Sequence, residues 1–120
     1  MTAFMFATGI ENSYPTIAGG QRIDEMEKCG HYQHWREDLQ LTSRLNIRFL
    51  RWGPAIYRTW LAPKKFDFAW TDEVIAEMQE LQITPIFDLL HFGLPDWLGN
   101  FQNREFPELF ADYAGECAAR

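Results

Sequence analysis

The sequence predicts an α/β fold in which three strand–helix units follow one another along the chain. Three short apolar stretches, residues 4–10, 47–52 and 83–90, have the composition of buried strands. Each is followed, directly or after a loop, by a segment with apolar residues at helical spacing. The second and third strands start far enough apart to enclose one parallel crossover, which takes roughly 30 residues or more. This order predicts a parallel sheet with right-handed crossovers and outer helices.

The first unit opens with "FMFATGI", Phe4–Ile10, an almost continuous apolar run that predicts a strand buried on both faces. A long loop follows, with turn residues at Pro15 and Gly19-Gly20. The segment 33–46 then predicts the first helix. Its expected inner face is formed by Trp35, Leu39 and Thr42.

The second unit places a strand at Ile47–Trp52, ended by Gly53-Pro54 because proline cannot continue a central ladder. A loop rich in Pro, Lys and aromatic residues is expected up to Trp70. Thr71 is the predicted N-cap of the next helix. The apolar stripe of that helix consists of Val74, Ile75, Met78 and Leu81.

The third unit has its strand at Ile83–Leu90 and a helix in which Pro107 fits the first turn. The inner face of this helix is expected to comprise Leu109, Phe110, Tyr113 and Cys117. A parallel sheet of three strands has two open edges, whereas a closed α/β barrel takes eight strands and roughly 250 residues. We therefore expect the 120 residues to be part of a larger unit.

Composition narrows the class of protein. A chain of 120 residues fits one domain, spanning 1–120, and 47% hydrophobic with 23% charged residues is ordinary for a globular chain. The net charge of −6 argues against nucleic acid as a partner. The sequence has no run of about 18 apolar residues, so no membrane-spanning helix is predicted. The start of the chain lacks the basic region of a signal peptide. Cys29 and Cys117 have no metal or redox spacing, so a cytoplasmic location is expected.

Three stretches together resemble the family 1 glycoside hydrolases, the β-glucosidase and 6-phospho-β-glycosidase group. They are "HYQHWREDLQLTSRLNIRFLRW", "LLHFGLPDWL" and, more loosely, "FMFATGIENSYP". The second resembles the family's His-aromatic-x-Leu-Pro element after the third strand. The resemblance implies the first three βα units of a (β/α)8 TIM barrel. It also implies hydrolysis of β-glycosidic bonds with retention, a carbohydrate substrate and no cofactor.

The same resemblance implies two catalytic glutamates, one after the fourth barrel strand and one after the seventh. Neither family motif, Asn-Glu-Pro or Glu-Asn-Gly, occurs in the 120 residues. Because general acid assistance alone contributes typically about 10²–10⁴-fold, this chain is expected to be inactive by itself. No residue of the chain is therefore predicted to be catalytic.

His91 and Phe92 are predicted substrate-binding residues, because they follow the third strand at the end where barrel enzymes build their sites. The resemblance implies that His91 donates to a sugar hydroxyl. The alternative is a histidine satisfied by a backbone carbonyl. Phe92 is a candidate for the cleft wall, with packing in the core as the alternative.

Arg48 is predicted to project into the same cavity, and the resemblance implies that it orients the nucleophile. Its alternative is a salt bridge to Asp88, while Arg51, three residues on, should face the other side. Glu11 stands near the place where the family has a sugar-binding glutamine. It is a predicted binding residue, although Asn12 or Tyr14 could take that place and Glu11 could simply pair with Arg48 or another cation.

Two further hypotheses concern the whole chain. His31 and His34 have a spacing that can hold a metal, but without a supporting ligand they are expected to pack structurally, and no metal site is predicted. The chain could also be a complete non-catalytic module that binds sugar or self-associates through its open strand edges. A doubly wound nucleotide-binding domain is disfavoured because no Gly-rich phosphate loop is present.

Overall fold

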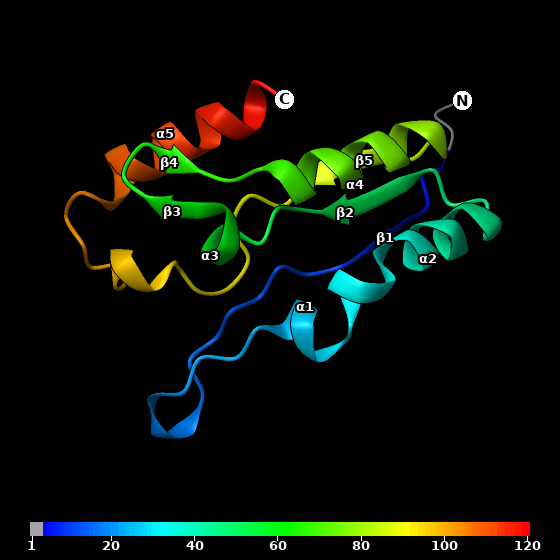
Figure 1. Ribbon diagram of the computed structural model, residues 1–120. Coiled ribbons are helices and arrows are strands. Elements are labelled where there is room, and N and C mark those ends of the chain that lie inside the picture. The colour runs from blue at the N-terminus through cyan, green and yellow to red at the C-terminus, as the bar shows by residue number, and fades with distance from the viewer. Residues whose placement is uncertain (1–3) are drawn as a thin grey trace.

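The computed structural model describes residues 4–120 and contains the predicted three-stranded parallel sheet, in the order β1-β2-β5 (Figure 1). The strands are β1 (Ala7–Gly9), β2 (Phe49–Trp52) and β5 (Thr84–Phe87). The prediction of successive βα units on a parallel sheet is confirmed. The remaining elements are η1 (Ala18–Gly20), α1 (Glu25–Lys28), α2 (His31–Arg44), α3 (Ile56–Thr59), β3 (Trp60–Ala62), β4 (Lys65–Phe66), α4 (Ala69–Glu80), η2 (Asp96–Leu98) and α5 (Phe106–Ala118).

The strand register decides which side chains share a face. Gly9, Arg51 and Ile86 are paired across the three strands. Since side chains alternate along a strand, these residues lie on one face, and Leu50 and Trp52 lie on the other. Leu50 and Trp52 are both fully buried. The helices therefore cover the face that carries Leu50 and Trp52, and Arg51 points to the opposite face.

Two apolar clusters hold the chain together. The first joins β2 to α2 and α4, which run alongside the sheet in Figure 1, and its main side chains are Trp35, Leu39, Leu50, Trp52, Val74 and Met78. The second joins α5 to the segment after β2, and it contains Ile56, Trp60, Phe68, Leu94, Leu98 and Tyr113. Within the second cluster the rings of Trp60 and Tyr113 stack with centroids 5.3 Å apart. The hydrophobic faces predicted for all three long helices thus meet a partner.

Some local predictions are wrong. The first strand was expected to be buried on both faces, but Ala7–Gly9 are exposed because β1 is an edge strand that pairs only with β2. The expected loop up to Trp70 contains the short helix α3 and the antiparallel hairpin β3–β4. Helix α4 begins at Ala69 instead of after Thr71, since the Asp67 side chain accepts a hydrogen bond from the Ala69 amide at 3.1 Å.

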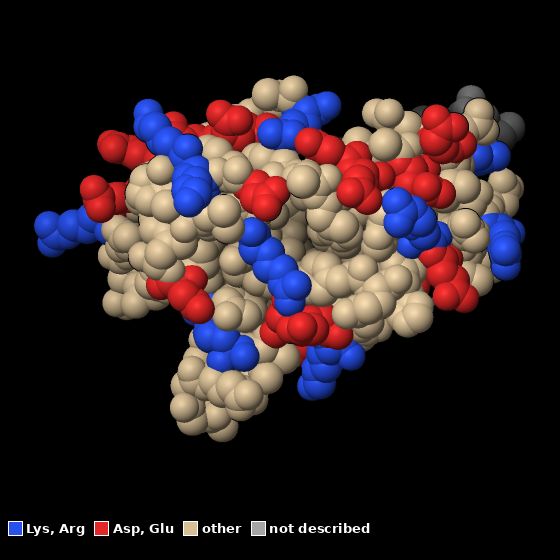
Figure 2. All heavy atoms as spheres, viewed as in Figure 1, with Lys and Arg blue, Asp and Glu red and all other residues tan. Residues whose placement is uncertain are grey.

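No helix in the described part of the chain is long and apolar enough to cross a membrane. On the face seen in Figure 2, acidic and basic side chains are interspersed, and no broad basic area is present on it. That face offers no array of cations for a phosphate backbone.

Buried tyrosines make the fold sensitive to alkali. Burial raises the pKa of Tyr32, Tyr57 and Tyr113 above the ordinary phenol value of 10.0. A tyrosine whose pKa is higher in the folded chain than in the unfolded chain makes its full contribution to stability below pH 10.0. This contribution is lost as the pH rises further. We expect the free energy of unfolding, measured in urea, to fall steadily above pH 10.0.

The tyrosinate absorbance provides the check on this prediction. The part of it that comes from Tyr32, Tyr57 and Tyr113 should rise in step with the loss of secondary structure, because these buried phenols ionise only when the chain opens. Tyr113→Phe keeps the ring packing and removes one of these three groups, so its stability should decline less steeply with pH. An unchanged free energy of unfolding well above pH 10.0 would contradict the prediction.

Candidate functional site

Four polar side chains converge where the parallel strands end: Glu11, Arg51, Asp88 and His91. Arg51 Nη2 donates to Glu11 Oε1 at 2.8 Å, and Arg51 Nε lies 3.9 Å from Asp88 Oδ2. Gly9 and Ile86 pair with Arg51, and Glu11 and Asp88 follow them by two residues each. Because side chains alternate along a strand, Glu11, Arg51 and Asp88 lie on the same face of the sheet. This is the carboxyl end of the strands, where open α/β sheets and barrels bind ligands.

His91 is held between two carboxylates. Its Nδ1 lies 2.8 Å from Asp88 Oδ2 and its Nε2 lies 3.2 Å from Glu11 Oε2. A carboxylate only accepts, so Nδ1 carries the proton of the hydrogen bond to Asp88. The Phe92 ring meets the imidazole edge-on with centroids 4.8 Å apart, and 61% of Phe92 is exposed.

The cluster therefore combines carboxylate acceptors, nitrogen donors and an open aromatic ring. Glu11 and Arg51 remain about half exposed, with 51% and 43% of their side chains accessible, whereas Asp88 retains 12%. A ligand that is rich in hydroxyl groups could exchange hydrogen bonds with the accessible members while Asp88 keeps the imidazole in place. Such an arrangement suits a neutral polyhydroxylated molecule.

The predicted position of Arg48 is wrong. Arg48 precedes β2, its Nη1 contacts the side chain of Gln82 at 3.4 Å, and its carbonyl accepts from the Thr84 amide at the start of β5. It therefore lies at the amino end of the sheet, away from His91. Arg51, which was expected to face elsewhere, provides the guanidinium of the cluster. The proposed Arg48–Asp88 salt bridge is replaced by the Arg51–Asp88 contact.

His91 is satisfied by side-chain carboxylates and not by a backbone carbonyl, so that alternative is wrong as well. Glu11 pairs with Arg51, and neither of its two carboxylate oxygens contacts Arg48. Sequence reasoning missed Arg51 as a member of the site and Asp88 as the partner of His91. No signal in the sequence identified Arg51, because only the strand register shows that it shares a face with Glu11 and Asp88.

The loops that frame the site are clamped to each other. The Tyr14 amide donates to the Phe92 carbonyl at 2.6 Å, and the Arg22 guanidinium donates to the Leu94 carbonyl. Gly93 has φ +89°, and a Cβ there would lie 2.0 Å from the Tyr14 carbonyl oxygen. Only glycine fits this position, and the contact fixes Phe92 beside the cluster.

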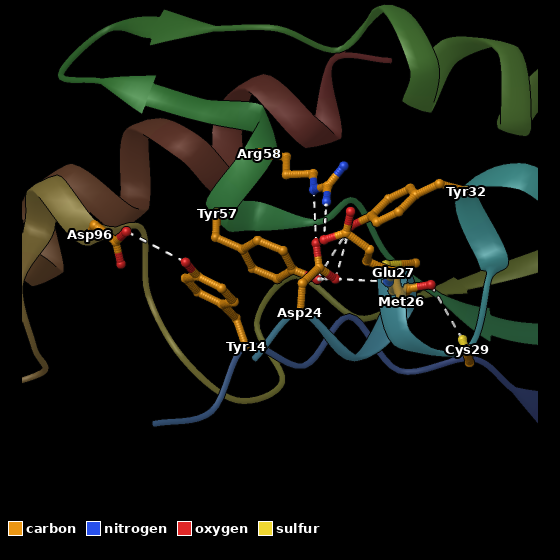
Figure 3. A network of polar contacts seen from close by, with 9 residues as sticks. All are labelled: Tyr14, Asp24, Met26, Glu27, Cys29, Tyr32, Tyr57, Arg58 and Asp96. Carbon is orange, nitrogen blue, oxygen red and sulfur yellow. Dashed lines mark hydrogen bonds and ion pairs between the residues drawn. The ribbon is translucent and has the colours of Figure 1, made fainter. Parts of the chain in front are cut away.

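A network centred on Asp24 holds the loop between β1 and α1 (Figure 3). The Asp24 carboxylate, 8% exposed, accepts from the Tyr57 hydroxyl at 2.8 Å and from Arg58 Nε at 2.8 Å. The Tyr32 hydroxyl donates to it at 3.1 Å. Asp24 also caps α1, since it accepts from the Glu27 amide. Helices α1, α2 and α3 are thereby joined at one carboxylate.

The other two histidines lie outside the polar cluster. His31 is 1% exposed, its Nδ1 lies 2.7 Å from Asp38 Oδ2, and Trp52 Nε1 donates to its Nε2 at 3.1 Å. The packing role predicted for His31 is confirmed. The same prediction is wrong for His34, which is exposed and lies 3.6 Å from Glu37. Within residues 4–120, no group of three or more His, Cys, Asp or Glu side chains is arranged to hold a metal ion.

Comparison with solved structures shows the same fold. The GH1 β-glucosidase from Exiguobacterium antarcticum B7 superposes with a TM-score of 0.77 and 25% identity, over 97% of this chain and 32% of that one. This chain is thus similar to one third of a (β/α)8 barrel, which confirms that its units are part of such a barrel.

Sequence comparison gives the same relationship. A putative myrosinase 3 of Arabidopsis thaliana is 29% identical over 116 residues, which are 91% of this chain and 26% of that protein. Beta-glucosidase A of Thermotoga maritima is 30% identical over 95 residues, 72% of this chain and 21% of that protein. The chain spans about a quarter of the length of these relatives. The model of glycosyl hydrolase family 1 matches residues 12–120, and the chain belongs to this family.

Proposed function

We propose that a protein containing this segment hydrolyses β-O-glycosidic bonds with retention, and that the segment supplies part of the site for the non-reducing sugar. The observation that carries the proposal is the convergence of Glu11, Arg51, Asp88 and His91 at the carboxyl ends of the strands. Family membership supports it. A carbohydrate is the partner that this set of donors and acceptors suits.

Each member has a proposed role. His91 binds a ring hydroxyl, Glu11 accepts from a second one, and Phe92 provides an apolar wall beside them. A glutamate accepts but does not donate when ionised, so Glu11 favours a sugar hydroxyl that donates, in contrast to a glutamine that could do both. Arg51, and not Arg48, contacts and orients the carboxylate that attacks the anomeric carbon.

The catalytic pair is proposed to come from residues outside this segment. Neither Asn-Glu-Pro nor Glu-Asn-Gly occurs within residues 1–120. In retaining enzymes the two carboxyl groups lie roughly 5–5.5 Å apart, one as nucleophile and one as acid and base. The segment alone is therefore proposed to bind without cleaving.

The test uses the longest protein that contains the segment and a p-nitrophenyl β-D-glucoside. His91→Ala is expected to lower kcat/KM by about 10-fold, the loss that follows from removing a hydrogen bond to a ring hydroxyl that strengthens in the transition state. His34→Ala is the matched control, because His34 lies on α2 with 65% of its side chain exposed, and its kcat/KM should match the wild type. Full activity of His91→Ala would refute the assigned role.

A second candidate function is self-association. Phe6, Ile86 and Phe87 on the edge strands or beside them are 72%, 39% and 42% exposed. Such apolar strand edges pair readily with another chain. A folded, monodisperse dimer of the 120-residue chain in light scattering would favour this function over a share in a barrel. Soluble monomer or aggregated material would speak against it.

A further inference from the structure

Asn12 stands at the meeting point of all three strand ends. It follows Glu11 directly and is 0% exposed. Its side-chain amide donates to the Pro54 carbonyl at 2.6 Å and to the Asp88 carbonyl at 2.9 Å. Pro54 follows β2 and Asp88 follows β5, so one side chain from the end of β1 ties the other two strands to it.

The chemistry of these contacts requires an amide. Both partners are carbonyl oxygens, which only accept, so the NH₂ group of Asn12 must face them. Alanine has no donor, serine has one, and an ionised aspartate would place a negative oxygen against two carbonyls. Asn12 Oδ1 has no hydrogen-bond partner within the described residues, which is consistent with the side chain being held by its two N–H groups.

Gly53 leaves the space that this tie needs. A Cβ on Gly53 would lie 3.0 Å from Asn12 Nδ2 and 1.8 Å from the Asp88 carbonyl oxygen. The ends of β2 and β5 thus approach each other too closely to leave room for a side chain at residue 53. A side chain at residue 53 would separate the two carbonyls that Asn12 joins.

We propose that Asn12 is a positioning residue, which sets the distance between Glu11 and the Asp88–His91 pair. The backbone carbonyl that Asn12 holds belongs to the residue whose carboxylate lies 2.8 Å from His91 Nδ1. Glu11, on the other side of the imidazole, is the neighbour of Asn12 in the chain. Loss of the tie lets these two supports of His91 move independently. The geometric claim stands on the structure, while its effect on sugar binding rests on the function proposed above.

The first measurement is independent of carbohydrate binding. Nitrogen-15 NMR follows the exchange of the His91 Nδ1–H proton with water in the wild type and in Asn12→Ala. In the variant we expect this exchange to be at least about 10-fold faster, the factor that corresponds to losing one to two of the hydrogen bonds that keep the site closed. If Asn12→Ala does not fold, Asn12→Ser retains one donor and should give an intermediate rate.

Asn103→Ala is the matched control. The Asn103 side chain also makes two hydrogen bonds to backbone, to the Leu98 carbonyl at 3.1 Å and from the Glu105 amide at 3.0 Å, but it lies in the loop before α5. Its loss should lower stability without changing the His91 exchange rate. Equal rates in the Asn12 and Asn103 variants would overturn the proposal and leave Asn12 with a purely structural role.

The second measurement is the affinity of the longest protein containing the segment for isofagomine lactam, by calorimetry. Asn12→Ala is expected to weaken binding about 10-fold, the effect of displacing one binding group from its position. Asn103→Ala is expected to weaken it less than about 2-fold. If the wild type does not bind this probe, the proposed function fails, and the exchange rates still decide the positioning role. Unchanged affinity in Asn12→Ala with faster exchange would refute its part in sugar binding.

Discussion

Replacing Gly53 with alanine is expected to lower the free energy of unfolding by about 3 kcal/mol, the upper end of the usual range for an added methyl group. The new Cβ would lie 1.8 Å from the Asp88 carbonyl oxygen. That oxygen cannot move away as a flexible side chain could, because the Asp88 amide donates to the Trp52 carbonyl at 3.0 Å and continues the ladder between β2 and β5. The strand ends must separate, and Asn12 loses its carbonyl partners.

Urea denaturation of the 120-residue chain provides the measurement. Gly115→Ala is the control, since it adds the same methyl group in α5, where no atom beyond the adjoining backbone of the helix and its chain neighbours comes within 4 Å of the new Cβ. That variant should gain about 0.5–1 kcal/mol, because glycine is unfavourable inside a helix. Gly53→Ala with wild-type stability would show that the close approach of the strand ends does not exist in solution.

The order of strands and long helices could be predicted because each is encoded locally. The apolar runs 4–10, 47–52 and 83–90 each contain one of the strands of the sheet, although the paired segments are shorter. The helical spacing of Trp35 and Leu39 identified the buried face of α2. Local periodicity needs no knowledge of the partner, so it survives in a single sequence.

The face of the sheet that carries the site could not be predicted. Alternation correctly placed Arg48 and Arg51 on opposite sides of the strand. However, Phe49 on one side and Leu50 on the other are both apolar, so hydrophobicity did not tell which side the helices cover. Only the burial of Leu50 against α2 and α4 settles this, and it is a tertiary contact. The wrong arginine was therefore assigned to the site.

The hairpin β3–β4 was missed for a related reason. Its strands have three and two residues, too few for a period to be visible. Trp60 is nevertheless 1% exposed, because it stacks on Tyr113 of the distant helix α5. The stability of this element comes from that helix, so the sequence around Trp60 shows only an irregular aromatic segment.

Replacing Asp24 with alanine is expected to lower the free energy of unfolding by about 3 kcal/mol, the lower end of the range for breaking a buried ion pair. The lower end applies because 46% of the Arg58 side chain is exposed and keeps part of its hydration, whereas Asp24 is 8% exposed. Two tyrosine hydroxyls, of Tyr32 and Tyr57, lose their acceptor at the same time. The N-cap of α1 is lost with them, so the loop from residue 12 to residue 24 should loosen.

The comparison of three variants separates this network from a general effect of charge removal. Asp112→Ala removes a carboxylate from the exposed side of α5 and should change the stability by no more than about 0.5 kcal/mol. Tyr57→Phe removes one donor and leaves the carboxylate with Arg58 and Tyr32, so a loss of about 1 kcal/mol is expected. If Asp24→Ala lost no more than Asp112→Ala, the carboxylate would not join the three helices. If Asp24→Ala loses much more stability than Tyr57→Phe, then Tyr32, Tyr57 and Arg58 all depend on the one buried carboxylate of Asp24.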